Sequence, residues 1–216
     1  MTKPSAKEPI LERIPVGPLA CNAYLIGCPR TKAGFIIDPG DDPEVLLERV
    51  RALGLKVKAL LHTHTHFDHV SGSRRLADAL GVPVCIHKDD LPLYQMLPQQ
   101  RRLFGLDPGE APHDVDRFLE DEEELVAGDL RLKVIHTPGH TLGSLCLSMG
   151  DRLFSGDTLF RGSIGRTDLG GTSPRELVHA IKTRLYPLDD PTQVHPGHGE
   201  ETTLGHEKRT NPYLAG

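Results

Sequence analysis

The sequence has few aromatic residues, no long apolar run and no excess of positive charge. Aromatic side chains make up 5% of the 216 residues and tryptophan is absent, although the hydrophobic fraction of 38% is that of a soluble globular protein. Without a run of roughly 20 apolar residues, we expect no membrane span and no secretory signal, which favours a cytoplasmic location. The net charge of −5 gives no electrostatic surface for nucleic acid or anionic membrane.

Cysteine is scarce as well. The four cysteines are widely separated and mostly lie in apolar, strand-like runs, which favours buried thiols over disulfides or zinc ligands: Cys21, Cys28, Cys85 and Cys146. A chain of this length can bury a substantial core. We predict a disordered N-terminus over residues 1–9 and one α/β domain over residues 10–216, as a monomer or a homodimer.

Strand and helix signals alternate along the chain. Asp42 and Pro43 predict a helix start, with Asp42 as the N-cap, and Gly54 predicts its end. The other predicted elements are strands over residues 10–16, 21–27, 34–38, 57–61, 82–87, 130–136, 144–149, 152–154 and 193–195, and helices over 73–80 and 174–188. Residues 89–121 are interrupted by four prolines and could form a flap over a site. In this segment we expect Arg101 and Arg102 to be solvated.

A histidine-rich tract follows the predicted strand that ends at Leu61. It holds four of the twelve histidines within eight residues and reads His64-x-His66-x-Asp68-His69, after His62. So dense a group of imidazoles indicates metal binding rather than solvated loop histidines. Residues two apart in an extended segment point the same way, so His64 and His66 can bind one ion and the next two residues a second. His62 falls outside this pattern and is expected to be structural.

Three later segments share one design, in which a strand ends, a glycine follows, and a ligand-type side chain comes next. They are Pro138-Gly139-His140, Gly156-Asp157 and Pro196-Gly197-His198. Loops at one edge of layered α/β sheets are where sites are commonly built. A glycine and histidine after a strand more often form a simple turn, but together the three segments complete a ligand set.

The count of ligands predicts a centre with two metal ions. His64, His66 and His140 would give one ion three nitrogens, whereas Asp68, His69 and His198 would serve the other. Asp157 could bridge the two ions through its two oxygens. Four protein ligands on each ion leave a position open for water, which is typical of a catalytic site rather than a structural zinc site. Zinc fits these donors best, and iron or manganese is also possible.

The pattern resembles the metallo-β-lactamase superfamily from Asp38 to the C-terminus. The motifs are Asp38 after a strand, the histidine tract, His140 after Pro-Gly, Asp157 in Gly-Asp-Thr, and His198 in Pro-Gly-His-Gly. The resemblance implies an α/β fold with four αββα layers: two mixed β-sheets face each other, helices cover the outer faces, and metals lie at one edge. It also implies that Asp38 supports the metal ligands.

Residues 160–168 and the tail at 203–214 are similar to short bacterial glyoxalase II-like proteins, the hydroxyacylglutathione hydrolases. That resemblance implies a thioesterase acting on S-2-hydroxyacylglutathione, such as S-lactoylglutathione, through a metal-bridging hydroxide, with Asp68 and Asp157 in the catalytic centre. Long-form glyoxalase II has a C-terminal helical domain that helps to bind glutathione, and only 18 residues follow His198 here. The small-molecule thioester is therefore better supported than its glutathione half.

Other functions and roles remain open. Residues 162–168 also resemble a segment of persulfide dioxygenases, which bind one Fe(II) through two histidines and an aspartate, here His64, His140 and Asp157. A metal-binding protein without turnover is a second alternative, whereas β-lactamase and nuclease activity are less favoured. Arg166 and Ser163 are candidate substrate contacts, although Arg166 could equally pair with Asp168. His87 and His136 are candidates to support the ligands.

Overall fold

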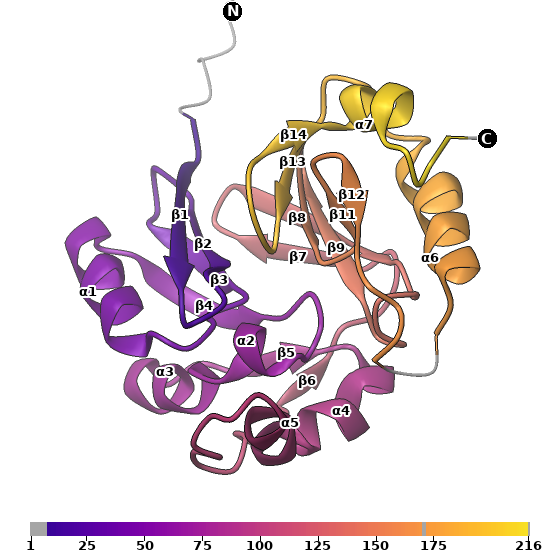
Figure 1. Ribbon diagram of the computed structural model, residues 1–216. Helices are drawn as coiled ribbons and strands as arrows, with labels where there is room; N and C mark the ends of the chain where they lie inside the picture. Colours follow the sequence, from indigo (N-terminus) through magenta and orange to yellow (C-terminus); the bar gives the residue numbers. More distant parts are fainter. Residues whose placement is uncertain (1–7, 170–171, 216) are drawn as a thin grey trace, which may run out of the picture.

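Two six-stranded sheets stand face to face in the computed structural model, which describes residues 8–169 and 172–215 (Figure 1). Residues 1–7 of the segment predicted to be disordered lie outside the described residues. Glu8 and Pro9 precede the first strand without regular structure of their own. None of the helices within the described ranges is long and apolar enough to cross a membrane.

The first sheet is built by the N-terminal half of the chain. Its strands, in spatial order, are β1 (Ile10–Val16), β2 (Cys21–Gly27), β3 (Ala33–Ile37), β4 (Lys56–Leu61), β5 (Val84–Ile86) and β6 (Arg117–Phe118). The pairs β1–β2 and β2–β3 are antiparallel, and the pairs from β3 to β6 are parallel. The sheet is therefore mixed, as predicted.

The second sheet comes from the C-terminal half. Its strands, in order from the opposite edge, are β14 (Thr202–Thr203), β13 (Gln193–Pro196), β10 (Arg152–Gly156), β9 (Leu145–Met149), β8 (Leu130–His136) and β7 (Glu124–Ala127). β10 and β13 run parallel and the other pairs antiparallel. A separate ribbon consists of β11 (Leu159–Phe160) and β12 (Ser163–Ile164).

Alternation of apolar side chains along the strands produces the layers. In β2, Tyr24 and Ile26 belong to the core between the sheets, whereas Leu25 packs outward with the helices. In β10, Phe154 points to the central core and Leu153 to the outer one. Successive side chains of a strand point to opposite faces, so strands buried on both sides require a covering layer of helices on each sheet.

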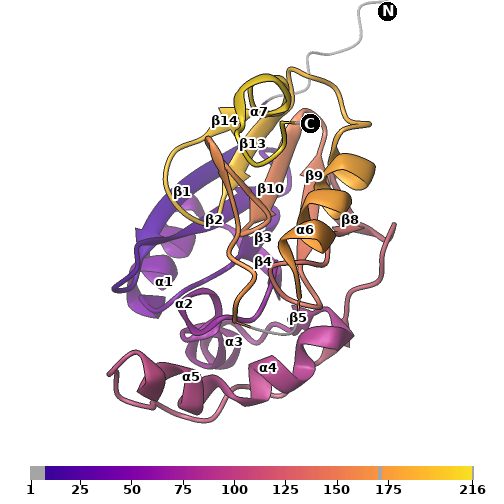
Figure 2. The same ribbon diagram turned by 45° about the vertical axis from the view of Figure 1, so that its right-hand side comes forward.

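The helices provide those outer layers. They are α1 (Pro43–Leu53), α2 (Phe67–Val70), α3 (Ser73–Leu80), α4 (Leu91–Gln95), α5 (Leu97–Leu103), α6 (Pro174–Ala180) and α7 (Leu204–Thr210), with a 3₁₀ turn at Lys88–Asp90 and a π-helical turn at Ile181–Leu185. Leu46 and Val50 of α1 pack on the first sheet, and Leu177 of α6 packs on the second. Figure 2 shows α6 beside β8 and β9, and α4 and α5 at the lower end.

Several local predictions need correction. Asp42 stands at the N-cap of α1, but its carboxylate accepts a hydrogen bond from the Gly17 N–H at 2.7 Å and does not cap the helix. The helix predicted over residues 174–188 changes to a π-helical turn at Ile181. The strand predicted over 82–87 covers three residues, and β7 was not predicted. All four cysteines are free and buried, which confirms that prediction.

Candidate metal centre

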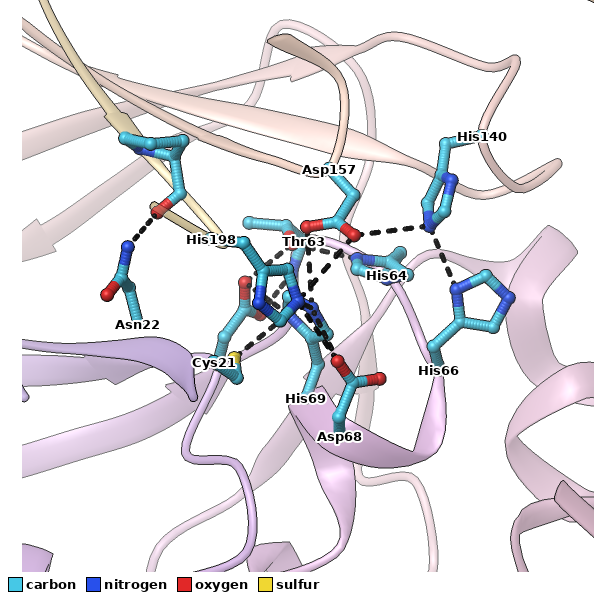
Figure 3. Close-up of polar contacts among 12 residues, drawn as sticks. Cys21, Asn22, Thr63, His64, His66, Asp68, His69, His140, Asp157 and His198 are labelled. Carbon is cyan, nitrogen blue, oxygen red and sulfur yellow. Dashed lines mark hydrogen bonds and ion pairs between the residues drawn. The ribbon is translucent and has the colours of Figure 1, made fainter. Parts of the chain in front are cut away.

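The ligand-type side chains meet where β3, β4, β8, β10 and β13 reach their C-terminal ends, between the two sheets (Figure 3). After β4, the chain passes through His64 and the extended residue His66 and then turns into α2, which carries Asp68 and His69. His62 turns away from this group. Its Nδ1 lies 3.0 Å from the Cys85 carbonyl oxygen and its Nε2 lies 2.7 Å from the Ser73 hydroxyl, which fits the structural role expected for it.

His64, His66 and His140 form the first cluster. One ring nitrogen from each residue lies within 4.8 Å of the others, and His66 Nδ1 is 2.9 Å from His140 Nε2. The Nε2 atom of His64 is buried and has no hydrogen-bond partner among the described residues. An unpaired polar atom inside a protein is costly, so three nitrogens converging in this way fit a metal ion.

Asp68, His69 and His198 form the second cluster. His198 Nε2 lies 3.0 Å from Asp68 Oδ2 and 3.3 Å from His69 Nε2, although His198 follows β13 of the other sheet. Their ligand atoms also lie within 4.8 Å of one another. One oxygen and two nitrogens from three separate backbone positions can therefore face a single ion.

Asp157 stands between the two clusters. Its Oδ1 is 3.4 Å from His69 Nε2 of the second cluster, and its Oδ2 is 3.7 Å from His140 Nε2 of the first. Oδ1 is buried and lacks a hydrogen-bond partner among the described residues. The carboxylate is thus placed to contribute one oxygen to each side, as a bridging ligand would.

The first cluster lies in surroundings that favour neutral imidazoles. Burial and then His140 lower the pKa of His66 to about 3, and burial together with the adjacent histidines holds the pKa of His64 well below its ordinary value. A neutral imidazole has a lone pair free for a metal, whereas an imidazolium does not. The donor set and its protonation both fit a divalent cation.

The second cluster has the opposite electrostatics. Burial alone would raise the pKa of Asp68, but His69 and His198 outweigh burial and lower it. Burial would likewise lower the pKa of His69, but Cys21 and then the surrounding carboxylates raise it well above its ordinary value. Negative charge concentrated around an imidazole stabilises any cation there, whether a proton or a metal ion.

Other residues orient the ligands through the far side of each ring. Asp38 Oδ2 lies 3.1 Å from His69 Nδ1, and the same carboxylate accepts hydrogen bonds from the N–H and the hydroxyl of Thr63. The carbonyl oxygen of Arg166 lies 2.7 Å from His140 Nδ1. Metal-binding histidines usually have such a partner on the second ring nitrogen, which fixes the ring and its tautomer.

The predicted glycines are required by close packing. A Cβ on Gly197 would lie 2.3 Å from Asp157 Oδ1 and 2.7 Å from His69 Cε1. Gly156 has φ of +48°, and a Cβ there would lie 2.2 Å from the Thr63 hydroxyl oxygen. These positions allow two loops of the second sheet to reach the ligands of the first.

Comparison with known proteins identifies the architecture. The profile of the metallo-beta-lactamase superfamily matches residues 16–198. The chain belongs to this superfamily. The predicted fold class is thereby confirmed, and the superfamily's divalent-metal chemistry agrees with the histidine and aspartate clusters.

Three known proteins are similar to this chain over nearly their whole length. GloC of Haemophilus influenzae, a hydroxyacylglutathione hydrolase, is 38% identical, with 94% of this chain and 97% of GloC covered. The crystal structure of BLEG-1, a B3 metallo-beta-lactamase, has a TM-score of 0.89 at 37% identity, covering 96% and 100%. The crystal structure of TTHA1623 in a di-iron-bound form has a TM-score of 0.85 at 44% identity, covering 94% and 100%.

Asp90 connects two loops of the candidate metal centre, and the sequence did not reveal this role. Its buried carboxylate accepts hydrogen bonds from the N–H of Thr65 at 3.0 Å, the N–H of Gly143 at 2.7 Å and the hydroxyl of Thr141 at 2.9 Å. It therefore ties the loop of His64 and His66 to the loop of His140. An aspartate beside Leu-Pro at a helix start has no motif that would reveal these distant partners.

Asn22 and Tyr24 were also missed. The Asn22 side-chain amide and the Tyr24 hydroxyl both donate to the Pro196 carbonyl oxygen, at 3.0 and 2.7 Å. The Asn22 N–H donates to the Gly197 carbonyl oxygen at 2.7 Å. These bonds hold the loop of His198 against β2, and the alternating pattern of a buried strand gave no sign of them.

Among the described residues, the side chains of the remaining candidates form no hydrogen bond with a predicted ligand. Arg166 forms a two-bond ion pair with Asp168, with both bonds at 2.7 Å, which is the structural role weighed for it. The Ser163 hydroxyl contacts the Ile164 carbonyl oxygen and does not line the cavity at the site. Within the described residues, His87 and His136 stack on each other at 4.2 Å without bonding to a predicted ligand.

Arg101 was predicted to be solvated, and this is wrong. Its side chain is 15% exposed and donates to Asp41 Oδ2 at 2.8 Å and to the Ser71 hydroxyl at 2.7 Å. Arg102, by contrast, is exposed. Arg101 thus connects α5 to Asp41, before α1, and to Ser71, at the end of α2.

Residues 89–121 contribute to a cavity over the metal centre, in keeping with the flap that was predicted. The cavity has a volume of about 260 Å³, and five predicted ligands line it: His66, Asp68, His140, Asp157 and His198. Leu93 of α4 and Met96, between α4 and α5, line the same cavity. A substrate in it would lie directly against the ligand cluster.

Proposed function

We propose that the protein is a metal-dependent thioesterase that hydrolyses S-2-hydroxyacylglutathione, with S-lactoylglutathione as the first substrate to test. The observation that supports this most is the position of Asp157 between the two clusters. With it, each cluster offers four protein donors, and the two lie close enough to act on one substrate bond. The similarity to GloC supports the choice of thioester.

The residues present fit two divalent ions, with zinc as the first choice and iron or manganese as alternatives. His64, His66 and His140 would hold one ion, Asp68, His69 and His198 the other, and Asp157 both. When bound, such ions supply an ionised water near neutral pH and polarise a carbonyl group. This chain would contribute fixed geometry, because Asp38 and the Arg166 carbonyl oxygen orient two of the imidazoles.

The composition of the cavity favours a thioester over an amide. Among the described lining residues there is no lysine, tyrosine or cysteine to protonate a poor leaving group. A thiol of pKa about 8.5 departs as the thiolate and needs no strong acid. Asp68 and Asp157 line the cavity, so both carboxylates would lie beside a bound substrate.

The mononuclear iron alternative has a specific observation behind it. His64, His140 and Asp157 also lie together, with the His64 and His140 ring centroids 4.6 Å apart and His140 Nε2 3.7 Å from Asp157 Oδ2. They could hold one Fe(II) in a persulfide dioxygenase. The second cluster favours hydrolysis, because a mononuclear enzyme does not need it.

The decisive experiment combines metal analysis with activity on protein purified without added metal. We expect two metal ions per chain and hydrolysis of S-lactoylglutathione that exceeds the hydrolysis of a β-lactam. One iron per chain, with oxygen uptake on glutathione persulfide, would replace the proposal by the dioxygenase. Fully metallated protein without activity on any thioester would support a binding role instead.

Variants test the ligand assignment. His66→Ala and Asp157→Ala should each lose stoichiometric metal and turnover, because each removes a donor that no other described side chain replaces. His179→Ala, on the exposed face of α6, is the matched control and should retain both. A ligand variant with full activity and metal would remove that residue from the site.

A further inference from the structure

We propose that the cavity beside the metal centre binds the acyl half of the thioester through apolar contacts, so that acylglutathiones with longer apolar acyl chains are better substrates than those with short ones. This inference rests on the proposed thioesterase function. It goes further by assigning the acyl specificity to the segments around α4 and α5.

Exposed apolar side chains gather around this one cavity. Ten large hydrophobic residues are exposed in the described chain, and five of them line the cavity: Leu19, Met96, Leu103, Phe104 and Leu169. Leu103 is 84% exposed and Met96 is 50% exposed. Single exposed apolar residues are ordinary, but a cluster of them marks a binding surface.

The cavity is continuous with the reaction centre. His66 and His140 of the first cluster lie in the same lining as Leu93 and Met96. A group in contact with these apolar side chains would therefore be attached directly to the bond that the centre cleaves. A docking surface for a protein partner would not need to include the predicted metal ligands, so this lining favours a substrate group.

The charge of the lining indicates which half of a thioester it receives. Arg166 is the one arginine or lysine among the described lining residues, and Asp168 already pairs with it. Biological thiols such as glutathione carry carboxylates or phosphates, which this lining does not match. The acyl half is the part of such a substrate that can be wholly apolar.

The apolar rim of the cavity, formed around α4 and α5 by Met96, Leu103 and Phe104, is fixed to the loop that carries His64 and His66. The Gln100 side-chain amide donates to the carbonyl oxygens of Leu93 and Thr65, at 2.8 and 3.2 Å, and its oxygen accepts from the Phe67 N–H at 3.0 Å. The Phe67 and Phe104 rings pack with their centroids 4.6 Å apart. The rim therefore keeps its distance from the metal ligands, as a specificity pocket requires.

The test is a series of S-acylglutathiones with acetyl, butanoyl, hexanoyl and octanoyl groups on the metal-loaded protein. Burial of one methylene corresponds to about a four-fold gain in binding, so kcat/KM should rise steeply until the cavity is full. S-methyl, S-butyl and S-hexyl glutathione, which cannot be hydrolysed, should bind with affinities that rise in the same order by calorimetry.

Variants connect the preference to the rim. The double variant Met96→Gln with Leu103→Gln keeps good helix formers and exposed positions, and should lower the octanoyl-to-acetyl ratio of kcat/KM at least ten-fold. Val126→Thr, at an exposed apolar position on β7, is the matched control and should keep the ratio of the parent protein.

The outcomes separate the two proposals. If no thioester is hydrolysed, the thioesterase function fails. The affinities of the S-alkyl glutathiones then still decide whether the cavity binds an apolar chain. Equal rates and equal affinities across the series would overturn the acyl pocket while leaving thioester hydrolysis intact. A double variant that changes oligomeric mass but not chain-length preference would overturn it as well, by making the rim a contact between copies.

Discussion

Asp38 Oδ2 lies 3.1 Å from Nδ1 of His69, on the side of the ring that faces away from the clusters. The contact joins the turn after β3 to helix α2. Asp38 has φ of +47°, a backbone conformation that non-glycine residues seldom adopt, so this turn holds its carboxylate in an unusual but fixed position. The orientation of a predicted ligand thus depends on a residue that is not itself predicted to bind metal.

We expect Asp38→Asn to weaken metal binding by about 10–100-fold, because the amide removes the negative charge that orients and polarises His69. Competition with a chelator measures this directly. Asp151→Asn, an exposed aspartate in the β9–β10 turn, is the control. Unchanged metal affinity in Asp38→Asn would show that the loop alone positions the imidazole.

Asp90→Asn should weaken the connection between the loops of His66 and His140. The amide nitrogen would face donors that now have an acceptor, which costs about 1–3 kcal/mol for each one left unpaired. We expect lower stability in urea and preferential loss of one of the two metal ions. The neighbouring Asp89→Asn, whose side chain is 47% exposed, should show neither effect. Equal loss of both ions would argue against a local role.

Arg101→Gln should destabilise the protein by about 1–3 kcal/mol, because it leaves the half-buried Asp41 carboxylate without its cation. It should also reduce any acyl-chain preference, since α5 carries part of the apolar rim. Arg102→Gln at the adjacent exposed position provides the comparison. If both variants unfold at the same urea concentration, the contacts of Arg101 contribute nothing net.

The stability of the metal-free protein should be greatest near pH 6.5. The pKa values of His64 and His66 are lowered in the folded state, so the unfolded chain binds more protons and stability falls as the pH drops below the ordinary histidine pKa of about 6.5. The pKa values of His69 and His198 are raised, so their contribution is present below that pH and is lost as the pH rises through the folded-state values.

Urea titrations of the metal-free protein from pH 5 to pH 8.5 measure this profile. His66→Ala should flatten the acidic side, whereas His179→Ala should leave the profile as it is. A stability that rises steadily across the whole range would mean that the raised values of His69 and His198 are not realised in solution.

The positions of the predicted ligands were accessible from sequence because each follows a strand end. Dense histidines after β4, and a glycine before His140, Asp157 and His198, are local signals, and the sheets place these local features at one edge. The strand predicted over residues 21–27 is observed as β2 with the same bounds, and its odd and even positions face different layers.

What could not be predicted depends on contacts between distant segments. The Asp90 carboxylate bonds to Thr65 and Gly143, and Arg101 bonds to Asp41, and no local pattern reports such partners. The missed strand β7 begins with Glu124 within an acidic run, and its alternation is too short to stand out. The π-helical turn after α6 likewise lies in a sequence with ordinary helical periodicity.

The proposed centre draws its donors from both sheets, with Asp68 and His69 on one side and His140, Asp157 and His198 on the other. Bound cations would therefore cross-link the N-terminal and C-terminal halves of the sandwich, which are otherwise held together mainly by apolar contacts. Removal of the cations by a chelator should then affect more than activity. The two halves should separate transiently more often, and amide protons along the facing strands should exchange faster.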